Sequence, residues 1–243
     1  MNILTQAVAI VKKILIYIAM QSEAQPIIDE LNFEETSILN PALPMKTYTG
    51  VSSKHSYFLV TGGKSSMYGV DNVGTEPAAV GLQAALQFFD ADLVINAGTA
   101  GGWQSKGAQI ADVYLGKSPV RYHDHRIPIP TFEAYGKGSY PCIETAELAQ
   151  LLNLKRGYIS TSNSLDFNTD CSRLMEENKA DCKEMEAAAL AWICHLYAKP
   201  FLPIKAITDF VDHEHPTAEQ FQENLAKTCL ALKDAFVKIL NNL

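Results

Sequence analysis

Short apolar runs rich in β-branched residues alternate with helix-forming segments along most of this chain. Residues 13–19 (KILIYIA), 57–61 (YFLVT) and 92–97 (DLVINA) are too short for helices and show little polar alternation. Runs of this kind are typical of strands that are buried on both faces of a sheet. Because helix-forming segments separate them, the pattern predicts an α/β fold in which helices cover a central sheet. Further strands are expected at residues 111–116, 157–161 and 201–207.

The expected helices carry start signals of their own. Ser22 is the expected N-cap of a helix that begins beside Glu23, at the end of the first strand. A second helix is expected within residues 74–90. A third should cover residues 184–197 (EMEAAALAWICHLY), which are rich in alanine and lack glycine and proline. From residue 217 onward, a capping box and a repeating apolar face predict a packed terminal helix.

Two irregular segments interrupt this alternation. A glycine-rich turn, residues 98–103 (GTAGGW), follows the third strand, at the place where open α/β sheets keep their ligands. Residues 123–142 hold three prolines and two glycines, and a loop of that length is longer than a simple connection between two elements needs to be. We expect the longer segment to be a binding or subunit-contact loop.

The composition excludes several classes of protein. Hydrophobic residues make up 47% of the 243 residues and charged residues 19%, which is typical of a globular protein rather than a disordered one. The formal charge is -7, and the 20 basic residues are scattered, so no nucleic-acid partner is expected. A small-molecule ligand fits better. The length is compatible with a single domain over residues 1–243.

The cysteines and the N-terminal segment bear on location. The five cysteines are widely spaced and form no CxxC pair, which argues against disulfides and zinc and favours a reducing cytoplasm. Lys12 and Lys13 interrupt the apolar N-terminal segment, and no small-residue cleavage site follows it. No other apolar run approaches the roughly 20 residues of a membrane span. We expect a soluble, unprocessed, cytoplasmic protein with no membrane contact.

Acidic residues recur where strands are expected to end, namely Glu23, Glu184, Glu186, Asp209 and Asp212. Side chains at such ends leave the packed layers and point into a common crevice. Cleavage of a glycosidic bond needs one carboxyl group to protonate the leaving group and another to activate water. For any one acid alone, a helix cap or a solvated charge is the commoner explanation. Composition leaves both interpretations open.

Six motifs in order decide between them. They are IAMQSEA (18–24), GVDNVGTEPAA (69–79), INAGTAGG (95–102), HRIPIP (125–130), EMEAAA (184–189) and AITDFVD (206–212). Together they resemble the 5′-methylthioadenosine nucleosidases of the purine nucleoside phosphorylase superfamily, and the plant branch is the most similar. The resemblance implies one three-layer α/β/α domain, nucleoside phosphorylase-like, with a central mixed sheet.

The resemblance also implies roles for individual residues. Glu23 is expected to orient and deprotonate the attacking water, and Asp209 to protonate adenine N7 as the N9 bond breaks. Thr208 and Lys205 would support that site and the water. The pocket should raise the pKa of Asp209, because a general acid needs its proton at neutral pH, whereas Glu23 needs the opposite state.

The remaining substrate contacts are carried over in the same way. Glu186 is expected to accept hydrogen bonds from the ribose hydroxyls and to favour the developing oxocarbenium charge. The other contacts to ribose, water and adenine would be Thr99, Ala100, Gly101, Leu165, Phe167 and Met185. The sequence departs from the family at Ser162 and Asn163, where Gly-Asp is usual.

The implied reaction is hydrolysis of 5′-methylthioadenosine to adenine and 5-methylthioribose, a step of methionine salvage. Two alternatives remain: a phosphate-dependent nucleoside phosphorylase, and a non-catalytic protein that binds adenine nucleosides. The segment LVINAGTAGG (93–102), which leads into the glycine-rich turn, lacks the arginine that the phosphorylases of the superfamily carry just before that turn. Its absence favours water as the nucleophile. Methylthioadenosine is the expected preference, and S-adenosylhomocysteine is left open. The resemblance further implies a homodimer in which residues 123–142 complete the neighbouring pocket.

No cofactor and no metal are expected. His123 with His125, and His213 with His215, form pairs that could bind a transition metal, but no third ligand is evident and the family reaction needs none. We interpret both pairs as parts of surface loops. Cys182 has no neighbouring base in sequence and is expected to be an inert buried thiol.

Overall fold

The computed structural model describes residues 11–243. Within that part of the chain the strands are β1 (Lys13–Ile18), β2 (Glu34–Thr36), β3 (Lys46–Val51), β4 (Ser56–Thr61), β5 (Leu93–Gly102), β6 (Val113–Tyr122), β7 (Lys155–Thr161), β8 (Ala180–Glu184) and β9 (Phe201–Phe210). The helices are α1 (Gln21–Glu30), α2 (Thr75–Leu86), the 3-10 turn η2 (Gln104–Lys106), α3 (Glu133–Lys137), α4 (Ala146–Leu152), α5 (Thr169–Glu177), α6 (Ala187–Leu196) and α7 (Thr217–Asn241).

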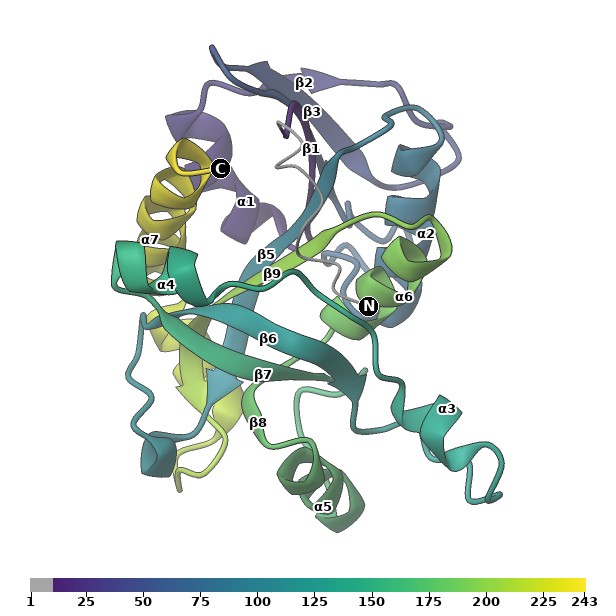
Figure 1. The fold of residues 1–243 in the computed structure, drawn as a ribbon, viewed down its shortest axis with the longest axis vertical. Helices are drawn as coiled ribbons and strands as arrows, with labels where there is room; N and C mark the ends of the chain where they lie inside the picture. Colours follow the sequence, from purple (N-terminus) through teal and green to yellow (C-terminus); the bar gives the residue numbers. More distant parts are fainter. Residues whose placement is uncertain (1–10) are drawn as a thin grey trace.

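The nine strands of this described part form one mixed sheet in the order β2-β3-β4-β1-β5-β8-β7-β6-β9. Strand β9 also pairs with β5, so β5, β8, β7, β6 and β9 close into a ring, from which β1 to β4 extend as an open wing. In Figure 1 the strands β6 and β7 cross in front of β5 and β9. The mixed central sheet expected from the sequence is confirmed.

Helices cover both faces of this sheet, which gives the three layers. Figure 1 shows α1, α4 and α7 on one side and α2 and α6 on the other. This arrangement explains why the sequence of β1 is apolar throughout. Ile14 and Ile16 pack with residues of α1 and α7, whereas Leu15 and Tyr17 pack with residues of α2 and α6. Since both faces of the strand are buried, polar side chains are disfavoured on either face.

Two helix starts differ from the expectation. Helix α1 is capped by Met20, not Ser22, and the Glu23 carboxylate accepts a hydrogen bond from the Met20 N–H at 3.3 Å, which takes over the capping role. Helix α6 begins at Ala187, because Glu184 ends strand β8. Residues 180–184 are polar in sequence but pair with both β7 and β5, so tertiary pairing draws Glu184 into the strand and delays the start of the helix that was expected at residue 184.

The predicted glycine-rich turn is also wrong: β5 continues as a strand to Gly102. It pairs with β9 as far as Phe210, with a shift in register between Ala100 and Gly101. A Cβ atom at position 101 would lie 2.6 Å from Oδ2 of Asp209, so glycine is needed for the close approach rather than for a turn. The long segment at residues 123–142 contains the short helix α3.

Residues 1–10 lie outside the described part, so the expectation for the apolar N-terminal segment that precedes Lys12 concerns residues that are almost all outside it. A single domain over residues 1–243 stays a prediction. Between residues 11 and 243, no helix combines the length and apolar character needed to cross a membrane.

Candidate active site

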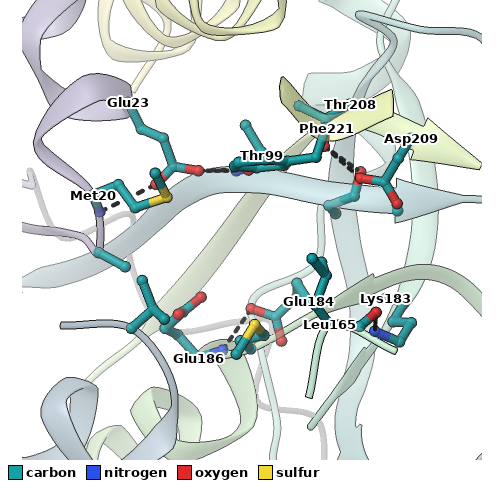
Figure 2. A pocket seen from close by; sticks show the side chains of 15 residues that line it. Met20, Glu23, Thr99, Leu165, Lys183, Glu184, Glu186, Thr208, Asp209 and Phe221 are labelled. Atoms are coloured by element: carbon teal, nitrogen blue, oxygen red, sulfur yellow. Dashed lines mark hydrogen bonds between the residues drawn. The ribbon is translucent and has the colours of Figure 1, made fainter. Parts of the chain in front are cut away.

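A cavity of about 260 Å³ opens where β1, β5 and β9 end. This is the place where parallel strands of α/β proteins present side chains to ligands. Figure 2 shows two facing sides: Glu23, Thr99 and Asp209 lie along one, and Glu186 and Lys183 along the other.

Glu23 occupies the third position of α1, and its side chain is held by hydrogen bonds from Thr99 on β5 and from Met20, the N-cap of its own helix. Oε1 accepts from the Thr99 N–H at 2.7 Å and from the Thr99 hydroxyl at 2.6 Å, and Oε2 accepts from the Met20 N–H at 3.3 Å. The residue is only 3% exposed. Three donors and the N-terminal end of a helix suit a charged acceptor that keeps one fixed orientation.

Asp209 lies near the end of β9 in a different environment. Burial raises its pKa, while the hydrogen bond from Thr208 and the charge of Lys183 partly oppose that rise. Oδ1 accepts from the Thr208 hydroxyl at 2.7 Å, and Gly101 leaves room for the carboxyl group on the β5 side. This carboxyl group therefore holds its proton more readily than an ordinary aspartate.

Glu186 precedes α6 and accepts one hydrogen bond, from the Gly74 N–H at 2.9 Å. Burial raises its pKa to about 7, and the charges of Glu184 and Glu23 add to the rise, whereas Lys205 and the Gly74 N–H oppose it. A buried carboxylate with one donor has acceptor capacity to spare. It is therefore available to hydroxyl groups of a ligand.

Glu184 and Lys205 form a buried ion pair beside the cavity, with Nζ 2.8 Å from Oε2 and both side chains 1% exposed. Glu184 also accepts from the Thr161 hydroxyl and from the N–H groups of Glu186 and Ala187. Burial alone would raise the pKa of Glu184, but the Lys205 charge and these hydrogen bonds hold it below the ordinary value. The hydrogen-bonding capacity of the Glu184 carboxylate is thus largely used, and its bonds from the N–H groups of Glu186 and Ala187 fix the start of α6.

The structure brings most of the expected site residues to this one cavity. Those that line it are Glu23, Thr99, Ala100, Gly101, Leu165, Met185, Glu186, Thr208 and Asp209. Lys205 acts from behind them through Glu184. Phe167 does not line the cavity; it lies in a separate hollow with Trp103 and Val211.

Five lining residues were not expected from the sequence: Ala19, Met20, Val73, Lys183 and Phe221. Phe221 belongs to the apolar face of the terminal helix and is indistinguishable there from a core residue. Lys183 lies beside Glu184 in the EMEAAA region, where the polar run gave no separate signal.

The unusual pair Ser162 and Asn163 makes specific contacts. The Ser162 hydroxyl donates to the Ser164 carbonyl at 3.0 Å. The Asn163 amide accepts from the Thr75 N–H at 2.8 Å and donates to the carboxylate of Glu76. Because an amide group can both accept and donate, Asn163 links the irregular segment 162–168 to the start of α2. This contact lies next to Gly74, whose N–H donates to Glu186.

The histidine pairs are not both in surface loops. His123 is fully buried, burial lowers its pKa to about 4, and its Nδ1 lies 3.1 Å from the Ser160 hydroxyl. The ring of His125 stacks on Tyr122 at 3.9 Å between centroids. Among residues 11–243, no three His, Cys, Asp or Glu side chains are grouped so that they could hold a metal ion. Cys182 is buried, and burial raises its thiol pKa, as expected for an inert group.

Residues 13–241 match the family model described as the phosphorylase superfamily. The chain is 41% identical over 233 residues to a 5′-methylthioadenosine nucleosidase of Arabidopsis thaliana, covering 95% of this chain and 87% of that protein. It is 38% identical over 235 residues to a 5′-methylthioadenosine/S-adenosylhomocysteine nucleosidase of the same plant, covering 95% and 91%. The solved apo structure of Arabidopsis thaliana 5′-methylthioadenosine nucleosidase matches with a TM-score of 0.94 at 40% identity, over 96% of each chain.

Proposed function

Because the chain belongs to the phosphorylase superfamily and, within it, to the 5′-methylthioadenosine nucleosidases, we propose that it hydrolyses the N-glycosidic bond of 5′-methylthioadenosine. The products are adenine and 5-methylthioribose, and the reaction belongs to methionine salvage. The observation that carries the proposal is one cavity lined by four buried carboxyl groups, of which Glu184 is paired with Lys205, while Glu23, Glu186 and Asp209 lie in three different environments.

The nucleophile is a water molecule held by Glu23. The carboxylate is fixed by Thr99 and Met20, so one orientation is available to accept the proton of a water on the same side of the cavity. As the water oxygen bonds to C1′ of the ribose, its proton passes to Glu23. A fixed carboxylate costs little reorganisation at that moment.

The leaving group is protonated from the other end of the cavity, where the pKa of Asp209 is raised by burial. Adenine departs when the C1′–N9 bond breaks and N7 takes the proton of Asp209. A neutral leaving group is better than an anion, which is the usual gain from a general acid.

The ribose lies between these two ends, against Glu186 and Met185. Glu186 accepts hydrogen bonds from the ribose hydroxyls with the capacity that the Gly74 N–H leaves free. Its negative charge also stabilises the positive charge that develops on the ribose ring. On the β5 side, Thr99, Ala100 and Gly101 allow the sugar and the water to approach the backbone.

Phosphate is a poorer nucleophile for this cavity than water. Of the described residues that line it, Lys183 is the one with a cationic side chain, and its Nζ already donates to two backbone carbonyls. A phosphate dianion is bound by arginine or lysine with backbone donors, whereas Glu23 would repel it. The hydrolase is therefore favoured over the phosphorylase.

The cavity lining supports a small apolar 5′ substituent. Apart from the charged groups, the lining is mainly apolar, with Ala19, Met20, Val73 and Phe221 among its members. A methylthio group is matched by such surfaces, while the zwitterionic tail of S-adenosylhomocysteine needs polar partners. Methylthioadenosine is thus the preferred substrate of this proposal.

We further propose a homodimer in which residues 123–142 complete the neighbouring pocket. Ile129, Phe132 and Tyr135 in this segment are 52%, 48% and 66% exposed, which supports a role in contacts between copies. A location in the cytoplasm is supported by the free thiols of all five cysteines. Sedimentation of the purified protein tests the dimer.

The test of function is adenine release from methylthioadenosine, S-adenosylhomocysteine and adenosine, each with and without phosphate. The proposal expects phosphate-independent release, fastest from methylthioadenosine. Strict dependence on phosphate would establish a phosphorylase, and binding without any release would establish a non-catalytic binding protein. Equal rates on both thio-nucleosides would overturn the preference.

A further inference from the structure

Lys183 is a buried cation whose surroundings the proposed reaction does not explain. It lies on β8, is 5% exposed and lines the cavity. Its Nζ donates to the backbone carbonyls of Ser164 at 2.9 Å and Leu165 at 2.6 Å. Within residues 11–243 it forms no ion pair with a carboxylate, unlike the neighbouring Lys205, which pairs with Glu184. A buried ammonium without a counter-charge is costly, so these carbonyls are its main compensation.

The two carbonyls belong to a segment that depends on side-chain contacts for its position. Residues 162–168 form no regular secondary structure, yet Leu165 reaches the cavity. Ser162 donates to the Ser164 carbonyl and Asn163 binds Thr75, but these bonds lie on the N-terminal side of Leu165. The bond from Lys183 to Leu165 therefore ties the tip of the segment to the sheet.

Lys183 also faces Asp209. Figure 2 shows them at the same end of the cavity, on opposite sides, with the side chain of Leu165 on the side of Lys183. Other titratable groups that act on the Lys183 charge come from several elements: Glu184 on β8, Asp166 in the 162–168 segment, Cys171 on α5 and His123 after β6. Burial lowers the pKa of Lys183, and among the carboxylates that oppose this change Asp209 has the largest effect.

We propose that Lys183 is a positioning residue that fixes the Ser164–Leu165 segment to β8 and so holds the side of the cavity against which the adenine base is bound. The role rests on the proposed function, since it concerns the base of the same substrate. The charge has a second consequence: together with the Thr208 hydrogen bond it lowers the pKa of Asp209 against the larger effect of burial, and so lowers the upper limit of the pH range in which the acid keeps its proton.

Two variants separate the hydrogen bonds from the charge. Lys183→Met removes both, and Lys183→Gln keeps an N–H donor without the charge. We expect K183M to raise KM for methylthioadenosine and Kd for adenine by about tenfold or more, because charge-assisted hydrogen bonds are lost, with a smaller loss of kcat. We expect K183Q to restore most of KM and Kd. Both variants should move the alkaline limb of kcat/KM to higher pH.

The matched control is Lys106→Met, which removes a comparable bond from Lys106 Nζ to the Ala180 carbonyl at 2.6 Å, outside the cavity. Its KM, adenine Kd and pH profile should equal those of the parent. Parental values of all three in K183Q and in folded K183M overturn the inference, and so do equal changes in K106M. If the parent binds adenine but releases none, the proposed reaction fails and the adenine titration still decides the role of Lys183. Failure of the parent to bind adenine overturns both.

Discussion

Glu184 and Glu186 lie two positions apart, are both buried, and have pKa values shifted in opposite directions. Glu184 has the Lys205 ammonium, the Thr161 hydroxyl and two backbone N–H groups around it. Glu186 has one hydrogen bond, from Gly74. The difference shows that partners, rather than burial or residue type, decide which acid is part of the scaffold and which is free for a ligand.

The same contrast separates two regions of the molecule. We call Glu184, Lys205 and Thr161 the floor, and Glu23, Glu186 and Asp209 the wall. Floor groups bind one another and leave little capacity for anything else. Glu184 also lines the cavity, but each of the wall groups is held by donors that leave lone pairs or a proton available for a ligand. Changes in the wall should therefore affect catalysis, and changes in the floor should affect stability.

The largest effects are expected in the wall. Glu23→Gln removes the proposed general base, and Asp209→Asn removes the proposed general acid, so each should lower kcat by about 10²–10⁴-fold. Both replacements keep the shape of the side chain and an oxygen that can still accept a bond from Thr99 or Thr208. Steady-state adenine release measures the loss, and thermal unfolding should give nearly the parental Tm. Near-parental turnover in either variant would remove the role assigned to that residue.

The floor should give the converse result. Lys205→Met leaves the Glu184 carboxylate buried without its counter-charge, at a cost of about 3–5 kcal/mol, and Tm should fall by about 10 °C for a chain of this size. Calorimetry measures the change. The double variant with Glu184→Gln should regain part of the loss, because no charge is then buried alone. An unchanged Tm for K205M would end the distinction between floor and wall.

Glu186 makes the wall sensitive to pH. With a pKa of about 7, its ionised fraction rises about tenfold between about pH 6 and pH 8. Because the carboxylate is the better acceptor for ribose hydroxyls, KM should fall by up to about tenfold over that range. Initial rates at fixed ionic strength test this, and Glu186→Gln should show a high KM that no longer varies with pH.

The same group predicts the sign of a stability change. An acid whose pKa is raised in the folded state takes up a proton on folding between its ordinary value and about 7. Stability is therefore lost as the pH rises through that window. The Tm of E186Q relative to the parent should increase from about pH 5 to pH 8, and the opposite trend would contradict the assigned environment.

Much of the fold could be predicted because β1, β5 and β9 are apolar on both faces and alternate with helices. Strand β8 could not, since Asp181, Lys183 and Glu184 give it a polar sequence. Their partners come from distant parts of the chain: Asp181 binds the Tyr158 N–H, and Glu184 binds Lys205. No local pattern encodes such pairing.

The site shows the same division. The position of Glu23 and Asp209 at the cavity could be predicted because they follow strands within recognisable motifs. Phe221 has the spacing of a core residue of the terminal helix, and nothing in that spacing marks its contact with the cavity. Phe167 was placed on the base by its neighbourhood in sequence, but the irregular backbone after Leu165 turns it toward Trp103 instead.

The smallest effect is expected where a wall residue is adjusted without being removed. Thr208→Val deletes the hydroxyl that donates to Oδ1 of Asp209 at 2.7 Å while keeping the shape of the side chain. This hydrogen bond favours the ionised form, so its loss should raise the pKa of Asp209 further and move the alkaline limb of kcat/KM upward. Since a single hydrogen bond is lost and the carboxyl group itself stays in place, kcat at neutral pH should change by less than about tenfold. Floor substitutions such as Thr161→Val should leave this limb in place, because they act on Glu184. A downward movement of the limb in T208V would mean that the hydroxyl stabilises the protonated acid instead, and the proton would then have to reach adenine by a different route.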